Sequence, residues 1–87
     1  MHAVIVSVTI NDPDAAERAF HEQLVPHVRQ LPGFVTGYWT IKDGTGLTIL
    51  VFETEDAANR MSEQAEATAP PAMTLQDVEV REVAAHA

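Results

Sequence analysis

The stretch 31–39 constrains the fold most, because a helical pattern changes there to a strand pattern within two residues. The helix-like spacing of apolar residues ends at Leu31, and Pro32-Gly33 follows, a pair that stops helices. From Phe34 to Trp39, the chain alternates as a half-buried strand does. A second strand-like run follows after a short turn, so this junction sets the order of the elements along the chain.

The first thirty residues predict one strand and one helix. Residues 2–10 are rich in β-branched side chains and predict a strand. One face of this strand is apolar and the other is mixed: Val4, Val6, Val8 and Ile10 against Ile5, Ser7 and Thr9. Asp12 is a suitable cap and Pro13 a suitable first residue for a helix that runs to about Leu31. Pro26 lies inside this helix, removes a backbone donor and predicts a kink.

The rest of the chain predicts two strands joined by a hairpin, then a helix and a last strand. The strands span 34–42 and 47–53, the helix begins after Thr54 as its cap, and the last strand runs from Met73 to about Ala84. Alternation assigns one set of side chains to the helix-covered side: Val35, Gly37, Trp39, Ile41, Leu47, Ile49 and Val51. The second helix has a thin apolar stripe, Ala58, Met61, Ala65 and Thr68.

The element order β-α-β-β-α-β predicts an α+β fold with one domain over residues 1–87. We expect the ferredoxin-like arrangement, in which a four-stranded antiparallel sheet carries two helices on one face. The uncovered face would then hold large apolar groups among hydroxyl side chains: Ile5, Phe34, Tyr38, Leu50 and Phe52 among Ser7, Thr9, Thr36, Thr40 and Thr48. Such a patch exposed on a monomer indicates an interface, so we expect a homodimer that pairs through the open sheet face.

Composition disfavours several classes of partner. The chain has 13 acidic and five basic residues, a formal net charge of −8, so nucleic acid and anionic membranes are disfavoured. It has no cysteine, and therefore neither a disulfide nor a thiolate metal ligand. No apolar run reaches transmembrane length, and residues 1–10 resemble a strand rather than a signal peptide, so we expect a cytoplasmic protein.

Three motifs together resemble a known family: residues 31–38, the strand 47–52, and Glu53-Thr54-Glu55-Asp56-Ala57-Ala58. The chain resembles antibiotic-biosynthesis-monooxygenase-like (ABM-like) domains of the dimeric α+β barrel superfamily. In those domains, a Pro-Gly-aromatic sequence leads into the second strand. The third strand ends in an aromatic residue, and a helix with acidic residues in its first turn follows. The resemblance implies a dimeric α+β barrel and an oxygenation that needs no cofactor. Haem-degrading relatives use an Asn within the first strand and a Trp and a His on the second helix, none of which this chain has.

Three residues are candidates for a site. Trp39 is predicted to face the helices, either as core filling or as a pocket wall with an indole N–H donor. His27 follows Phe20 by seven residues and is predicted to point toward the sheet, as a general base or as a residue that bonds free carbonyls at a helix end. Tyr38 lies on the predicted dimer face, as an interface residue or as a donor inside the barrel. We expect no metal site, because Glu17 and His21 lack a third ligand.

These observations leave two principal hypotheses for function. The first is a cofactor-independent, monooxygenase-like oxidoreductase that acts on a small aromatic or polyketide-like compound. The second is a dimer that binds a small apolar or aromatic molecule without catalysis, or that acts in a stress response. A cavity lined by Trp39 and His27 favours the first hypothesis, and a cavity without an ionisable group favours the second. Solid packing throughout would indicate a purely structural dimer.

Overall fold

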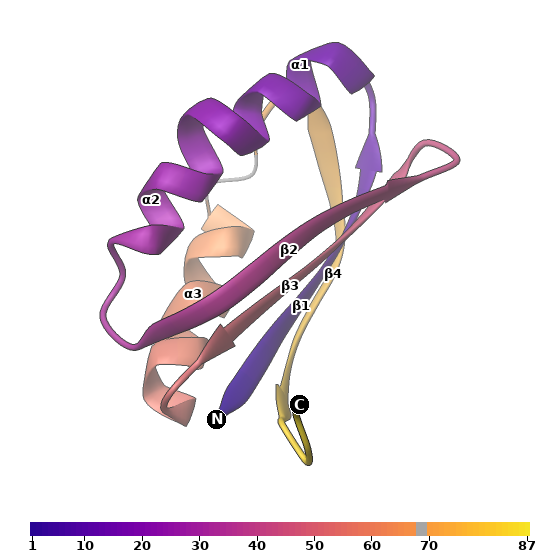
Figure 1. Cartoon of the computed structure of the whole chain (residues 1–87). Helices are drawn as coiled ribbons and strands as arrows, with labels where there is room; N and C mark the ends of the chain where they lie inside the picture. Colours follow the sequence, from indigo (N-terminus) through magenta and orange to yellow (C-terminus); the bar gives the residue numbers. More distant parts are fainter. Residues whose placement is uncertain (68–69) are drawn as a thin grey trace.

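The computed structural model describes residues 1–67 and 70–87 and has the predicted α+β architecture (Figure 1). Four strands form one antiparallel sheet in the order β2-β3-β1-β4. Their bounds are His2–Ile10 for β1, Phe34–Lys42 for β2, Thr45–Phe52 for β3 and Met73–Glu82 for β4. The helical segments lie on one side of this sheet, so the ferredoxin-like fold class is confirmed.

The first helical segment is continuous but changes its winding. It consists of α1 (Pro13–Ala19), one π-helical turn η1 (Phe20–Leu24) and α2 (Val25–Arg29). Asp12 caps it by accepting a hydrogen bond from the Ala15 N–H at 3.2 Å. The π turn ends two residues before Pro26, which has no N–H and whose ring crowds the preceding turn. The wider turn accommodates that ring, so the predicted distortion takes the form of a π turn.

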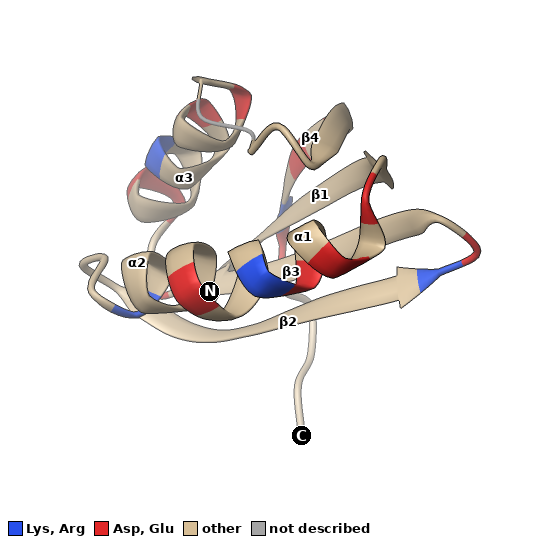
Figure 2. Ribbon diagram, turned by 90° about the horizontal axis from the view of Figure 1, so that it is seen from above, with Lys and Arg blue, Asp and Glu red and all other residues tan. Residues whose placement is uncertain are grey.

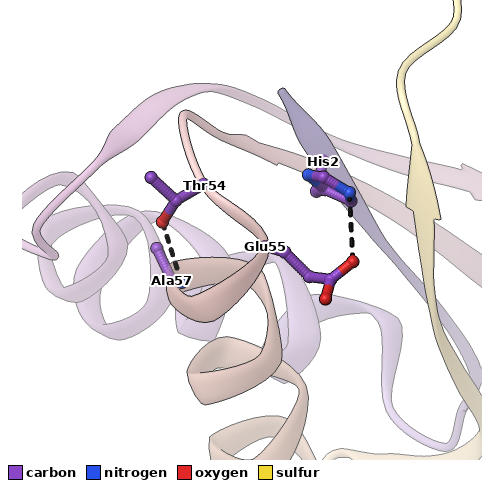
Figure 3. Close-up of polar contacts among 4 residues, drawn as sticks. All are labelled: His2, Thr54, Glu55 and Ala57. Atoms are coloured by element: carbon purple, nitrogen blue, oxygen red, sulfur yellow. Dashed lines mark hydrogen bonds and ion pairs between the residues drawn. The ribbon is translucent and has the colours of Figure 1, made fainter.

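The second helix, α3, spans Glu55–Ala67 and begins as expected. Thr54 Oγ1 accepts a hydrogen bond from the Ala57 N–H at 3.2 Å, which satisfies one free donor of the first turn (Figure 3). Next to it, His2 Nε2 lies 3.3 Å from Glu55 Oε2, so the start of β1 is tied to the start of α3. Of the predicted apolar stripe, Ala58 and Met61 are buried, whereas Thr68 lies outside the described residues.

The junction before β2 is built on Gly33, whose φ of +79° favours glycine. The Leu31 N–H donates to the Val28 carbonyl and closes the helix. The Gly33 carbonyl then accepts from the Glu53 N–H at 2.8 Å. This bond ties the end of the helical segment to the residue that follows β3, and it places the loop beside the start of α3.

The buried core lies between the sheet and the helices. The strands contribute Val4, Val6, Val8, Ile10, Leu50, Phe52 and Met73, and the helical segments contribute Ala16, Ala19, Phe20, Val28, Ala58 and Met61. The rings of Phe34 and Phe52 pack edge to face with centroids 5.7 Å apart. Gly37 leaves room for Phe34 and Leu50, because a Cβ there would lie 3.3 Å from Phe34 Cζ and 2.7 Å from Leu50 Cδ2.

The predicted facing of β3 is wrong. Val4 of β1 is opposite Leu50, and Val6 is opposite Thr48, so these β3 residues share the helix-covered side with the core of β1. Leu50 and Phe52 are each 1% exposed, whereas Leu47, which alternation assigned to the core, is 43% exposed. Both faces of β3 are apolar, so only the pairing register decides which one is buried.

The predicted facing of the first residues of β2 is also wrong. Phe34 is opposite Phe52 and Thr36 is opposite Val51, so Val35 is an extra residue in a bulge. The bulge turns Phe34 toward the helices, although it was predicted on the open face. It leaves Val35 45% exposed, although it was predicted in the core. Beyond the bulge, the alternation of Gly37, Tyr38 and Trp39 is as predicted.

Candidate functional site

A cavity of about 70 Å³ lies between the helices and the sheet. The sheet forms its floor, η1 and α2 form one wall, and α3 forms the other. Pro70 and the β4 residues Met73 and Leu75 also line the cavity. Its lining is predominantly apolar: Val6, Val8, Phe20, Leu24, Val28, Leu50, Met61, Ala65, Pro70, Met73 and Leu75 among the apolar residues, with His27, Trp39, Thr48 and Gln64.

The first wall depends on the π turn. Phe20, Leu24 and Val28 follow one another at intervals of four residues, and all three line the cavity. The wider π turn takes up one residue more than an α turn, which keeps this row directed at the sheet past Pro26. It also carries His27 to the rim, where the side chain remains exposed to solvent. The turn thus gives the wall its straight apolar face and one ionisable group.

The floor is set by the pairing of the strands. Trp39 of β2 is opposite Thr48 of β3, and Thr48 is opposite Val6 of β1, so the three side chains form one row across the sheet. Thr48 is 7% exposed. A small hydroxyl residue therefore lies between an indole ring and a valine on a floor that is otherwise apolar.

The polar atoms of the cavity fall into two groups. His27 Nε2 and Gln64 Oε1 are 3.1 Å apart and join α2 to α3 across the rim. The Thr48 hydroxyl and the Trp39 indole N–H, by contrast, have no hydrogen-bond partner among residues 1–67 and 70–87. Unpaired polar groups in an apolar cavity cost stability unless water or a ligand pairs with them. These two groups are therefore the ones that a polar ligand atom would contact.

The structure brings two of the three predicted site residues together. His27 and Trp39 both line the cavity, from the helical wall and from the floor. Tyr38 does not: it lies on the opposite side of the sheet and is 63% exposed. Sequence reasoning missed Thr48, because alternation assigned it to the wrong face. It also missed Gln64, whose contact with His27 joins residues that are 37 positions apart and leaves no local signal.

The other polar clusters do not form a comparable site. Glu17 and His21 border a shallow hollow on the outer surface of the first helical segment. Within the described ranges, no three His, Cys, Asp or Glu side chains are arranged to hold a metal ion. On the open sheet face, Arg81 Nε donates to Glu79 Oε1 at 2.8 Å, and this hydrogen bond raises the pKa of the guanidinium.

The open sheet face is apolar along its central strands. Ile5 of β1 and Ile49 of β3 are paired and partly exposed, and Tyr38 lies beside them on β2. Leu47 and Val51 extend the patch along β3. Charged residues are absent from β1 and β3 and gather on the helices, at the hairpin tip and on β4 (Figure 2). The face is therefore an uncharged strip bordered on one side by the polar edge strand.

Together these features define a small α+β domain of the ferredoxin-like class, with an apolar cavity between its two layers. Residues 35–87 match the family described as a domain of unknown function (DUF3110), and the chain belongs to this family. Comparison with proteins of curated function gives no match. None of the helices in residues 1–67 and 70–87 is both long and apolar enough to cross a membrane.

Proposed function

We propose that this domain binds a small, mainly apolar molecule in the cavity between its helices and its sheet. The observation that carries the proposal is the pairing of an apolar lining with two unpaired donors on its floor, Thr48 and Trp39. Ligand sites commonly combine an apolar surface with a few polar groups that orient the ligand. One polar atom of the ligand would accept from the floor while its apolar part displaces water.

The size of the cavity limits the ligand. An apolar cavity of about 150 Å³ admits benzene, and this cavity measures about 70 Å³. A short alkyl chain fits, and a single ring enters only when a wall side chain moves. Met61 is unbranched and adapts its shape readily. The volume therefore favours a small aromatic or aliphatic compound over a polyketide with several rings.

We also propose that two chains pair through their open sheet faces as a dimeric α+β barrel, the assembly implied by the resemblance to ABM-like domains. The support is the uncharged strip around Ile5, Tyr38 and Ile49, which pairing would remove from water. In that assembly the helix–sheet cavities lie on the outer layers, and Tyr38 lies between the sheets. A ligand site between the sheets is the alternative location for the small molecule.

A cofactor-independent oxygenation is the second candidate function, because one ionisable side chain, His27, lies at the rim of the cavity. In this reaction His27 takes the proton of a phenolic substrate, and the phenolate passes an electron to dioxygen. A carbon–oxygen bond forms, the oxygen–oxygen bond breaks with loss of water, and a quinone remains. His27 is the catalytic residue in this hypothesis, and Trp39 positions the ring.

Binding is tested by NMR of methyl-labelled protein titrated with benzene and with phenol. We expect shifts at the methyl groups of Leu24 and Leu50, which line the cavity, and none at Leu47 on the open face. Ala65→Leu fills the cavity and should abolish the shifts, whereas Ala67→Leu, on the exposed end of the same helix, should not. Equal shifts at Leu47, or none at the cavity methyls, would contradict the proposal.

The two candidate functions are separated by oxygen consumption. The protein is incubated with phenol in air-saturated buffer, and oxygen uptake and quinone formation are compared between the wild type and His27→Gln. Oxygenation predicts uptake that the substitution removes while phenol binding persists. Binding without uptake leaves the domain as a non-catalytic ligand-binding protein.

Sedimentation at micromolar concentration tests the dimer. Ile49→Glu or Tyr38→Glu places an unpaired charge in the proposed interface and should yield a monomer that remains folded. Gln23→Glu adds the same charge on the exposed side of η1 and should leave the dimer intact. A wild type that sediments as a monomer would refute the sheet-to-sheet assembly.

A further inference from the structure

A second hollow of about 210 Å³ adjoins the cavity on the side of the helix–strand junction. Its walls come from the turn before β2, the end of β3 and the face of α3 that carries Ala57, Arg60, Met61 and Gln64. Five of its lining residues are apolar: Leu31, Pro32, Phe52, Ala57 and Met61. Two are polar, Arg60 and Gln64. This outer hollow is therefore apolar over most of its wall and carries a single charged group.

The inner cavity and the outer hollow share two side chains. Met61 and Gln64 line both of them. Gln64 is also the residue that contacts His27 Nε2 at 3.1 Å across the rim. These two side chains of α3 thus lie between the two spaces, and an elongated molecule would reach both only after the flexible Met61 side chain rotates.

Arg60 supplies the recognition group of the outer hollow. It makes no ion pair within the part of the chain that the structure describes. Asp56 and Glu63 lie one turn away on either side of it along α3, yet neither reaches its guanidinium. The guanidinium presents a planar fork of donors that matches a carboxylate. An exposed cation beside an apolar hollow is complementary to an anion that carries an apolar tail.

We propose that the ligand of this domain is a carboxylate with a short apolar tail. The carboxylate pairs with Arg60, and the tail passes Met61 and Gln64 into the inner cavity, where it contacts Leu50. This inference rests on the proposed binding function of the inner cavity and specifies the chemical class of its ligand. The net charge of −8 repels free anions, so the tail must contribute to the affinity.

Calorimetric titration with matched probes tests the ligand class. Hexanoate, hexan-1-ol and acetate separate the contributions of charge and tail. We expect hexanoate to bind more tightly than hexan-1-ol and acetate not to bind, with a hexanoate affinity that falls as salt is added. Hexanoate should also shift the methyl signals of Leu50 in the inner cavity.

Substitutions in the two spaces test where each end of the ligand binds. Arg60→Gln should lower the affinity for hexanoate about fivefold and leave the affinity for hexan-1-ol unchanged, because an exposed ion pair contributes up to about 1 kcal/mol. Arg18→Gln removes the same charge from α1, away from both spaces, and should change neither. Ala65→Leu shortens the inner cavity and should weaken octanoate more than butanoate.

The outcomes separate this inference from the proposed function. If hexan-1-ol and hexanoate bind equally and Arg60→Gln changes neither, the inner cavity binds apolar molecules but the carboxylate assignment is wrong. If Arg60→Gln weakens hexanoate and Leu50 does not shift, the tail does not enter the inner cavity, and the assignment is again wrong. If none of these probes binds while benzene and phenol still shift the methyl groups of the inner cavity, only this inference fails; if benzene and phenol also cause no shifts, the binding function fails as well.

Discussion

Replacing Thr48 by valine tests the description of the cavity floor most directly. Valine keeps the branched shape of threonine and removes only the hydroxyl, which has no partner among the described residues. A fully buried hydroxyl without a hydrogen bond costs about 1–3 kcal/mol, but the Thr48 oxygen is not fully buried, since His2 Nδ1 is the one such unpaired side-chain atom among the described residues. The hydroxyl borders a cavity that has room for water, so the lower end of this range applies. We therefore expect Thr48→Val to raise the free energy of unfolding by about 1 kcal/mol.

The measurement is urea and thermal unfolding followed by far-ultraviolet circular dichroism. For a domain of this size, 1 kcal/mol corresponds to a rise in Tm of about 4–8 °C. Thr40→Val is the matched control, because the Thr40 hydroxyl donates to the Leu47 carbonyl at 2.6 Å. Losing that exposed bond should lower stability by about 0.5–1 kcal/mol.

We expect the two substitutions to change the free energy of unfolding in opposite directions, with an increase for Thr48→Val and a decrease for Thr40→Val. If Thr48→Val destabilises the protein as Thr40→Val does, the Thr48 hydroxyl is satisfied in the free protein, and the reasoning about the floor is wrong. The same variant also tests the site. In the NMR titration, Thr48→Val should lower the affinity for phenol more than the affinity for benzene, since only phenol offers an oxygen to the hydroxyl.

Three further predictions concern the packing that supports the site. Gly37→Ala should cost about 1–3 kcal/mol in urea unfolding, because the new Cβ would lie 2.7 Å from Leu50 Cδ2, and an unchanged midpoint would disprove that close approach. Phe52→Glu should abolish cooperative thermal unfolding rather than only dissociate a dimer, since the ring is 1% exposed in the core; a folded monomer in sedimentation would contradict this. Thr54→Ala should lower Tm through the loss of about 1 kcal/mol of helix capping at the Ala57 N–H, whereas Thr54→Ser should preserve it.

Local chemistry in the sequence predicted the elements and their order. Asp12 and Thr54 cap the two helical segments as expected, and Pro32-Gly33 separates the first of them from β2. The strand bounds of β1 and β2 agree with the alternation of apolar and polar residues. These features depend on neighbours in the chain, which is why the sequence alone indicates them.

The candidate site was predicted only in part. His27 and Trp39 reach the same cavity because each depends on the phase of a single element. The roles of Thr48 and Gln64 depend instead on contacts between elements: the register of β3 against β1, and the approach of α3 to α2. No local pattern encodes such contacts, and a shift of one residue in register would exchange the two faces of β3.

The junction at 31–39 shows this division most clearly. The sequence by itself determined that a helix ends before Pro32-Gly33, although its last helical residue is Arg29 rather than the predicted Leu31, and that Trp39 and Tyr38 point to opposite sides of a strand. The tertiary structure decided that Phe34 joins the core, because the bulge at Val35 reverses the alternation before it. It also decided that Trp39 borders a cavity, because the packing of two helices against the sheet leaves that space unfilled.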